Sequence, residues 1–291
     1  MSGGPLEGRV CVVAGASRGV GRGVAVGLGE AGATVICSGR STRFGHRTEG
    51  RRETVEDAAE AVEQAGGKGY PYVCDHTDPK ALYDFAAWVL RRFGAPSLVA
   101  CAVWGGNEGF DGDHYADGSR YGTPFFARPL QPFETAMLTG PYAVLATARA
   151  FAPVMMPAGR GLFVSVGFDA ADAYLGDVFY DLGKAGILRA ARAMAAELAP
   201  HGLASVHLTP GFVRTERVLD AGHGPMATQS PLYAGRAVAA LAALDDPMAL
   251  NGQSLFVADL ARRFGFTDID GTQPPRFDIS APPPAGPDSA P

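Results

Sequence analysis

Seven short apolar runs alternate with longer segments of helical periodicity, and this alternation restricts the fold of the chain more than any other feature. Strands joined by connections of roughly a dozen residues or more pair in parallel, through helical crossovers, rather than as hairpins. The pattern therefore predicts an α/β fold with a doubly wound, seven-stranded parallel sheet. The expected strands are Arg9–Ala14, Thr34–Ser38, Tyr70–Cys74, Leu98–Val103, Gly161–Val166, Ala204–Leu208 and Ser254–Val257.

The segments between these runs divide into helices and two long irregular stretches. Apolar residues at helical spacing predict two long helices, Phe133–Met156 and Leu175–Pro200. Shorter helices are expected at Thr54–Ala65, from Pro79 to Phe93 and at about 231–244. Residues 105–132 and 211–230 lack periodicity. Because long loops in a compact domain are usually functional, we expect these two to cover a substrate.

Composition and charge favour one globular domain and exclude several kinds of partner. Hydrophobic residues make up 47% of the 291 residues, enough for one large core, and we place a single domain at residues 6–272. Residues 273–291 are Pro-rich and are expected to form a partly disordered tail. The net charge is −5, with both signs interleaved, which argues against nucleic-acid and membrane partners.

Targeting signals and metal motifs are not apparent in the sequence. No apolar stretch has the length of a signal peptide or a membrane span, so we expect a cytoplasmic protein. The four cysteines lie in or beside expected strands, at Cys11, Cys37, Cys74 and Cys101. They show no zinc-ligand spacing, so we expect buried thiols and no metal site.

A glycine-rich turn, Gly15-Ala16-Ser17-Arg18-Gly19-Val20-Gly21, joins the first strand to a helix. Glycines let the backbone turn tightly and approach a pyrophosphate closely. The N-terminus of the following helix offers N–H groups and a positive dipole to the phosphates. In this strand–turn–helix context the motif predicts a dinucleotide-binding fold of the Rossmann type.

The end of the second strand predicts which dinucleotide binds. An acidic residue there would bind the ribose 2′-hydroxyl of NAD, whereas an arginine accommodates the 2′-phosphate of NADP. The chain has Ser38-Gly39-Arg40-Ser41, with no acid, and Arg18 in the glycine turn adds a second cation. Two guanidinium groups near one phosphate favour NADP(H).

Tyr180 and Lys184 form a candidate acid/base pair. They are four residues apart on an expected helix, so they share one face. A phenol titrates near ~10, and a neighbouring cation favours its ionised form. The pair therefore predicts proton transfer by Tyr180.

These motifs, in this order and spacing, resemble the short-chain dehydrogenase/reductases over essentially the whole folded length. Asp75 after the third strand and the run Pro210–Thr215 belong to the same pattern. A closer likeness to one branch of the family is carried by Trp104-Gly105-Gly106, by residues 155–166 (MMPAGRGLFVSV) and by residues 259–271.

The resemblance implies a role for each matching position. Tyr180 would be the catalytic acid/base, and Lys184 would hold the nicotinamide ribose. Asp75 and His76 would flank the adenine, and Val213 and Thr215 would contact the carboxamide. The implied cofactor-binding residues are Gly15, Ser17, Arg18, Gly19, Val20, Arg40, Asp75, His76, Lys184, Val213 and Thr215. The family also pairs subunits through its two long helices, which implies a homodimer or homotetramer.

The chain departs from the family at two polar positions. The family's helix Asn aligns with Gly140, and its Ser-Ser pair falls on Gly167-Phe168, with Phe168 expected in place of a hydroxyl. Loss of a comparable oxyanion donor lowers rates by about 10²–10³. Aromatic residues predict a largely apolar substrate pocket. Its expected residues are Trp104, Phe168, Tyr174 and Phe212.

Three functions are compatible with this set of residues. The first is an NADP(H)-dependent oxidoreductase acting on a carbonyl or alcohol of a small, largely apolar molecule. The second is an enzyme of the same fold that performs cyclisation, dehydration or isomerisation. The third is a non-catalytic NADP-binding protein. Consumption of cofactor during turnover separates the first from the second, and any turnover separates both from the third.

Overall fold

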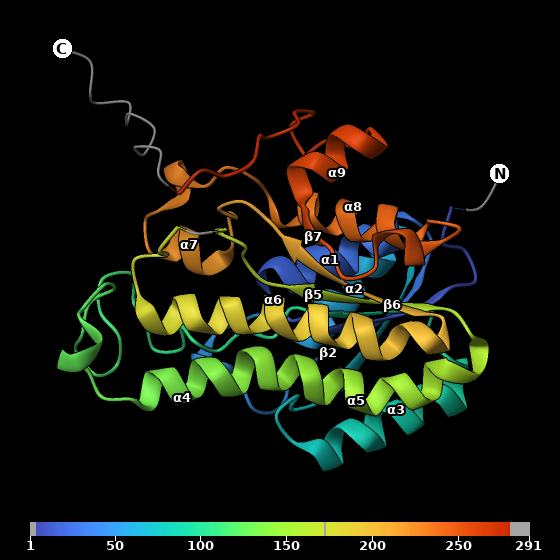
Figure 1. Cartoon of the computed structure of the whole chain (residues 1–291), viewed down its shortest axis with the longest axis horizontal. Coiled ribbons are helices and arrows are strands. Elements are labelled where there is room, and N and C mark those ends of the chain that lie inside the picture. Colours follow the sequence, from blue (N-terminus) through green and yellow to red (C-terminus); the bar gives the residue numbers. More distant parts are fainter. Residues whose placement is uncertain (1–3, 172, 280–291) are drawn as a thin grey trace.

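Seven parallel strands form the central sheet of a computed structural model in which residues 4–171 and 173–279 are described (Figure 1). The strand order is β3-β2-β1-β4-β5-β6-β7, which confirms the doubly wound sheet. The order reverses between β1 and β4, and ligands of such sheets bind at the carboxyl ends of the strands near this reversal. The strands are β1 (Val10–Ala14), β2 (Thr34–Gly39), β3 (Lys68–Val73), β4 (Leu98–Cys101), β5 (Gly161–Val166), β6 (Leu203–Thr209) and β7 (Ser254–Phe256).

Helices cover both faces of the sheet, in two groups (Figure 1). On one face lie α1 (Gly19–Glu30), α2 (Val55–Gln64), α8 (Pro231–Ala242) and α9 (Val257–Phe264). On the other lie α3 (Pro79–Phe93), α5 (Ala143–Met155) and α6 (Val178–Leu198), with α4 (Gln131–Met137) before α5. The short α7 (Glu216–Asp220) falls inside a segment that we expected to be irregular.

The expected helix Phe133–Met156 is interrupted. A π-helical turn at Leu138–Tyr142 separates α4 from α5 and contains Gly140 and Pro141. Proline has no N–H to donate to the preceding turn and its ring disturbs a regular helix, which accounts for the break. π-turns inside helices are frequent at functional sites.

Alternation along β5 and β6 decides which side chains reach which helices. Phe163 belongs to the core beneath α3, α5 and α6, whereas Leu162 and Val164 belong to the core beneath α1 and α8. In β6, Leu203 and Val206 divide in the same way. Residues of odd number at the ends of both strands therefore face α6.

The described part of the expected tail lies against the domain. Gln273 Nε2 donates to the carbonyl oxygens of Ala261 and Phe266, both at 2.9 Å. Arg276 pairs with Asp259, and residues 280–291 lie outside the described residues. Within the described ranges, no helix is both long and apolar enough to cross a membrane. All four cysteines are buried free thiols, as predicted.

Candidate cofactor and active site

The glycine turn after β1 packs closely against the backbone that follows β4 and offers a hydrogen-bond donor to an anion. Gly15 has a φ of +77°, and a Cβ there would lie 2.9 Å from the backbone of Ala102, so a side chain does not fit. The backbone N–H of Gly19, at the start of α1, donates to Glu216 Oε2 at 2.8 Å. A carboxylate therefore stands where the helix N-terminus would bind a phosphate.

Arg18 has hydrogen-bonding capacity left over. Its Nη2 lies 3.4 Å from Glu49 Oε2, and burial lowers the pKa of the Arg18 guanidinium. Its Nη1 is buried without a hydrogen-bond partner among the described residues. Because buried polar atoms almost always have a partner, this N–H fits a further anionic group.

Arg40, at the end of β2, is also paired with a carboxylate. It forms an ion pair with Glu108, in the long loop 105–132. We expected Arg18 and Arg40 to bind the 2′-phosphate, and in this structure each is paired with a glutamate. These pairs are partly exposed, and exposed pairs of this kind contribute about 0–1 kcal/mol, so a phosphate could replace the glutamates.

Asp75 and His76 follow β3 and differ in burial. Partial burial raises the pKa of Asp75, but hydrogen bonds from Thr77 outweigh it and hold the pKa below its usual value. The His76 imidazole is 3% exposed and lies 2.9 Å from both Ser38 Oγ and Thr147 Oγ1. Burial lowers the pKa of His76 to about 4. The structure thus places this imidazole inside the core rather than at the surface expected to meet adenine.

The loop after β6 meets the glycine turn. Thr215 Cγ2 lies 3.3 Å from the position of a Cβ on Gly19, and its hydroxyl accepts a hydrogen bond from Val218 N to begin α7. Val213 is buried and pairs with Gln229 in an isolated bridge. Ser17 and Val20 lie half-buried in the turn itself. The structure thus brings most of the expected cofactor residues to one edge of the sheet.

Tyr180 and Lys184 lie on one face of α6, as predicted. Asp177 caps the helix by accepting from the N–H groups of Phe179 (3.0 Å) and Tyr180 (3.1 Å). Lys184 Nζ lies 5.2 Å from the centre of the Tyr180 ring. Burial raises the pKa of Tyr180 and lowers that of Lys184 to about 7. The expectation that Lys184 lowers the pKa of the phenol is therefore wrong here, because burial disfavours the charged form of both groups.

The indole of Trp104 fills the space beside this pair. Lys184 Nζ lies 3.6 Å from the centre of the Trp104 ring, and the rings of Trp104 and Tyr180 meet edge to face at 5.4 Å. A Cβ on Gly140 would lie 3.0 Å from Trp104, and one on Gly183 2.7 Å from it. A larger side chain at position 140 or 183 would therefore collide with the indole.

Gly167 and Phe168 face opposite sides of the sheet. A Cβ on Gly167 would lie 3.2 Å from Ile187 Cγ2 of α6, on the helix that carries Tyr180 and Lys184. The Phe168 ring instead packs edge to face with Phe277 at 6.2 Å. The expectation that Phe168 replaces the hydroxyl is therefore corrected, because the alternation of the strand gives that position to Gly167.

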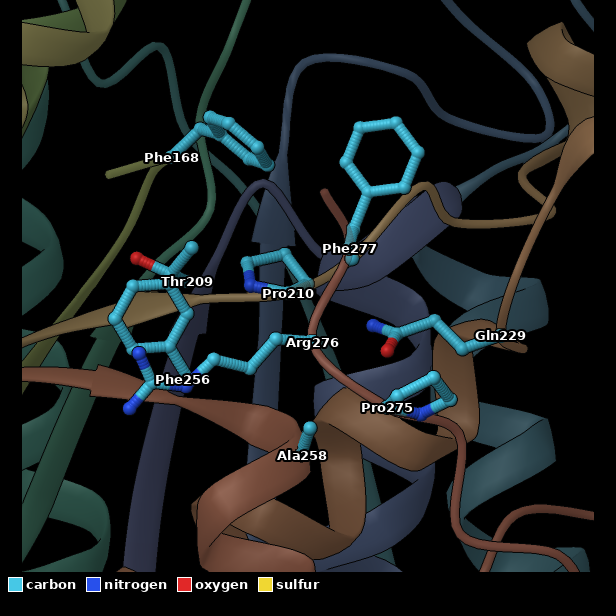
Figure 2. Close-up of a pocket in the computed structure, with 10 residues that line it drawn as sticks. Phe168, Thr209, Pro210, Gln229, Phe256, Ala258, Pro275, Arg276 and Phe277 are labelled. Carbon is cyan, nitrogen blue, oxygen red and sulfur yellow. The ribbon is translucent and has the colours of Figure 1, made fainter. Parts of the chain in front are cut away.

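The expected pocket residues do not form one group. Phe168 and Phe212 both contact Phe277 of the C-terminal segment, and Figure 2 shows Phe168 and Phe277 together at the pocket between β6 and this segment. Trp104 lies beside Tyr180, whereas Tyr174 is 60% exposed. Phe277 was missed in the sequence because it falls in the Pro-rich segment expected to be partly disordered.

A buried ion pair that the sequence did not reveal ties the long loop to α6. Arg128 Nη1 lies 2.5 Å from Asp177 Oδ2, with both side chains 2% exposed. The Arg128 guanidinium also lies 4.5 Å from the centre of the Tyr115 ring and 4.8 Å from that of Phe179. Tyr121 Oη donates to Leu175 O at 2.5 Å, and its ring is 6.2 Å from that of Tyr180. The loop 105–132 therefore closes over the start of α6.

The chain is similar in sequence to proteins of one known family. Residues 9–224 match the family model of short chain dehydrogenases. Dehydrogenase/reductase SDR family member 1 of Mus musculus is 32% identical over 92% of this chain and 85% of its own length.

Two solved structures share the fold. A short chain dehydrogenase of Mycobacterium thermoresistibile superposes with a TM-score of 0.76 at 21% identity, covering 97% of this chain and 98% of the other. A 7α-hydroxysteroid dehydrogenase, complexed with NADH and 7-oxo glycochenodeoxycholic acid, superposes with a TM-score of 0.68 at 20% identity, covering 92% and 96%. The chain therefore belongs to the short-chain dehydrogenase/reductase family, whose members are oxidoreductases that bind a nicotinamide cofactor.

Proposed function

We propose that this protein is an NADP(H)-dependent oxidoreductase that interconverts a carbonyl and an alcohol in a small, largely apolar molecule. One observation carries the proposal: an anion-binding glycine turn and the Tyr180–Lys184 pair lie at the carboxyl edge of one sheet. Aromatic side chains around Tyr180 and at Phe212 support an apolar substrate.

The residues present fit the cofactor. Gly15, Ser17, Gly19 and Val20 would hold the pyrophosphate, where the Glu216 carboxylate now accepts from Gly19. The unpaired Nη1 of Arg18 supports a role for Arg18, with Arg40, in binding the 2′-phosphate. Asp75 would lie near the adenine. The residues near the nicotinamide would be Lys184, Val213 and Thr215. When bound, the nicotinamide ring supplies or accepts a hydride at the substrate carbon.

Tyr180 would hold the proton that the substrate oxygen gains or loses. Because burial raises the pKa of Tyr180, the phenol is protonated at neutral pH and can donate to a carbonyl oxygen during reduction. Asp177 fixes the first turn of α6 and so the position of Tyr180. Trp104 packs against Tyr180 and excludes water from that side.

A second candidate, non-redox chemistry in the same site, is supported by the two lost polar groups. Gly140 faces Trp104 and Gly167 faces Ile187, so neither position offers the family's amide or hydroxyl. Such an enzyme would turn over its substrate without consuming NADPH.

We further propose a homodimer or homotetramer. Exposed apolar side chains on α3 and around α5 support this assembly, among them Tyr83, Tyr142 and Leu145. A monomeric mass by light scattering at micromolar concentration would contradict it.

Cofactor titration tests the proposal. We expect NADPH to bind more tightly than NADH, and Arg18→Ala or Arg40→Ala to weaken NADPH binding by about 10- to 100-fold through loss of a charge-assisted hydrogen bond. Arg43→Ala is the matched control, because Arg43 pairs with Asp57 and Glu60 of α2. Tyr180→Phe should abolish reduction and leave NADPH affinity unchanged. Equal affinity of the wild type for the two cofactors would contradict NADP(H) preference.

A further inference from the structure

A histidine from the neighbouring strand occupies the space beside Gly167. A Cβ on Gly167 would lie 2.4 Å from His207 Nε2, closer than any side chain permits. His207 pairs in register with Ser165, two residues before Gly167, so both positions face α6. The imidazole is fully buried. The His207 ring can occupy this place only because residue 167 is a glycine, since any side chain at position 167 would displace the imidazole.

A hydrogen-bonded chain sets the protonation of this histidine. His207 Nδ1 lies 3.0 Å from Ser254 Oγ and 3.3 Å from Thr209 Oγ1. The pKa of Asp169 lies below its usual value. Burial raises that pKa, and a hydrogen bond from the Ser254 hydroxyl is among the interactions that lower it. An ionised carboxylate can only accept, so Ser254 donates its one proton to Asp169 and accepts from His207 Nδ1–H. His207 Nε2 is then unprotonated and carries a lone pair.

This lone pair has no partner among the described residues. Nε2 is buried and makes no hydrogen bond in the described part of the chain. Groups of this kind nearly always have a partner, so Nε2 is directed at a donor not yet assigned. The charged groups around His207 are Asp169, Lys184 and Arg192. Ionised Asp169 cannot donate and Arg192 is exposed, which leaves Lys184 as the buried donor.

Lys184 is the donor that fits. It lies on α6 three residues before Ile187, whose side chain meets the same space at Gly167. It is 8% exposed, and its Nζ lies 3.6 Å from the centre of the Trp104 ring. A buried ammonium needs hydrogen-bond acceptors, and His207 Nε2 is a buried acceptor on the strand that α6 covers.

We propose that His207 is a positioning residue of the active site: its Nε2 accepts a hydrogen bond from a water molecule that in turn accepts one from the Lys184 ammonium. The inference rests on the proposed function, in which Lys184 acts beside Tyr180. Through this water molecule the chain Asp169–Ser254–His207 stabilises the charged lysine. This chain of side chains would act in a site that lacks the serine and the asparagine expected from the family pattern.

Two variants of similar size distinguish the hydrogen bond made by His207 Nδ1 from the one made by Nε2. In His207→Asn the amide can replace Nδ1 at Ser254 but does not reach the Nε2 position. In His207→Gln the amide can place an acceptor at the Nε2 position. Folding of both is checked by melting temperature, and the pKa of Lys184 is read by NMR on protein labelled at lysine Cε.

We expect His207→Asn to lower the pKa of Lys184 by about 1, because the charged form loses an acceptor, and His207→Gln to restore most of it. With a carbonyl substrate and saturating NADPH, kcat should fall about tenfold in His207→Asn and recover in His207→Gln. A packing role alone would change the melting temperature and leave the pKa of Lys184 where it is.

The outcomes distinguish this inference from the proposed function. Suppose that the wild type reduces no carbonyl, but the pKa of Lys184 falls in His207→Asn and recovers in His207→Gln. Then the proposed function fails and the hydrogen bond is supported. If the wild type is active and neither variant alters kcat or that pKa, the inference is wrong. Nitrogen-15 spectra of the wild type decide the matter even if His207→Asn does not fold, since a protonated Nε2 at neutral pH would overturn it.

Discussion

Replacement of Arg128 by methionine should destabilise the protein and release the loop 105–132. Arg128 and Asp177 form a buried pair at 2.5 Å, and Asp177 also caps α6. Breaking a buried pair leaves an uncompensated charge and costs about 3–5 kcal/mol. Since domains are stable by about 5–15 kcal/mol, the loss is a large fraction of the total.

A double-mutant cycle isolates this pair. Asp177→Asn retains a good helix cap but leaves the guanidinium unpaired, whereas Arg128→Met with Asp177→Asn leaves no buried charge. We expect each single variant to lose about 3 kcal/mol or more, and the double variant to lose less than their sum by at least about 2 kcal/mol.

Urea unfolding followed by circular dichroism measures the free energies, and trypsin cleavage at Arg120 reports release of the loop. Arg120 is exposed, so cleavage there depends on the mobility of the backbone. The reasoning is refuted if Arg128→Met unfolds at the same urea concentration as the wild type and the loop stays protected.

Three further predictions concern buried titratable groups and one packing contact. Burial lowers the pKa of Lys184 from 10.5 to about 7, so between these values the unfolded chain binds a proton that the folded chain lacks, and stability rises with pH. Lys184→Met should therefore melt above the wild type at pH 6, and the difference should shrink toward pH 10. Burial also lowers the pKa of His76 and His207 to about 4, so stability should fall as pH drops from about 6.5 to 4, and His76→Gln should reduce that slope in melting scans. Gly183→Ala should lower the free energy of unfolding in urea by about 1–3 kcal/mol, because the new Cβ would lie 2.7 Å from Trp104. Since alanine favours helices, the same change in a Trp104→Ala background should stabilise the protein.

Local patterns in the sequence predicted the frame of this protein well. The seven strands appear within about two residues of their expected ends, because alternation and β-branched runs are properties of neighbouring residues. The glycine turn precedes α1 as expected, and Tyr180 and Lys184 share a face of α6, since helical spacing alone places them there.

What the sequence did not reveal depends on residues far apart in the chain. The pairing of Arg128 with Asp177 and the approach of His207 to Gly167 exist only once β5, β6 and α6 are assembled. The glutamates that pair with Arg18 and Arg40 come from loops without periodicity. The raised pKa of Tyr180 follows from burial, which spacing along a helix does not predict.

Transfer of deuterium from cofactor to product tests the central claim most directly. The purified protein is incubated with NADPH deuterated at C4 of the nicotinamide and a panel of apolar ketones and aldehydes, and the products are analysed by mass spectrometry. We predict one deuterium on the carbinol carbon of a product alcohol, from one of the two C4 positions only, and no product with Tyr180→Phe. Turnover of a substrate without loss of NADPH or incorporation of deuterium would contradict the redox function.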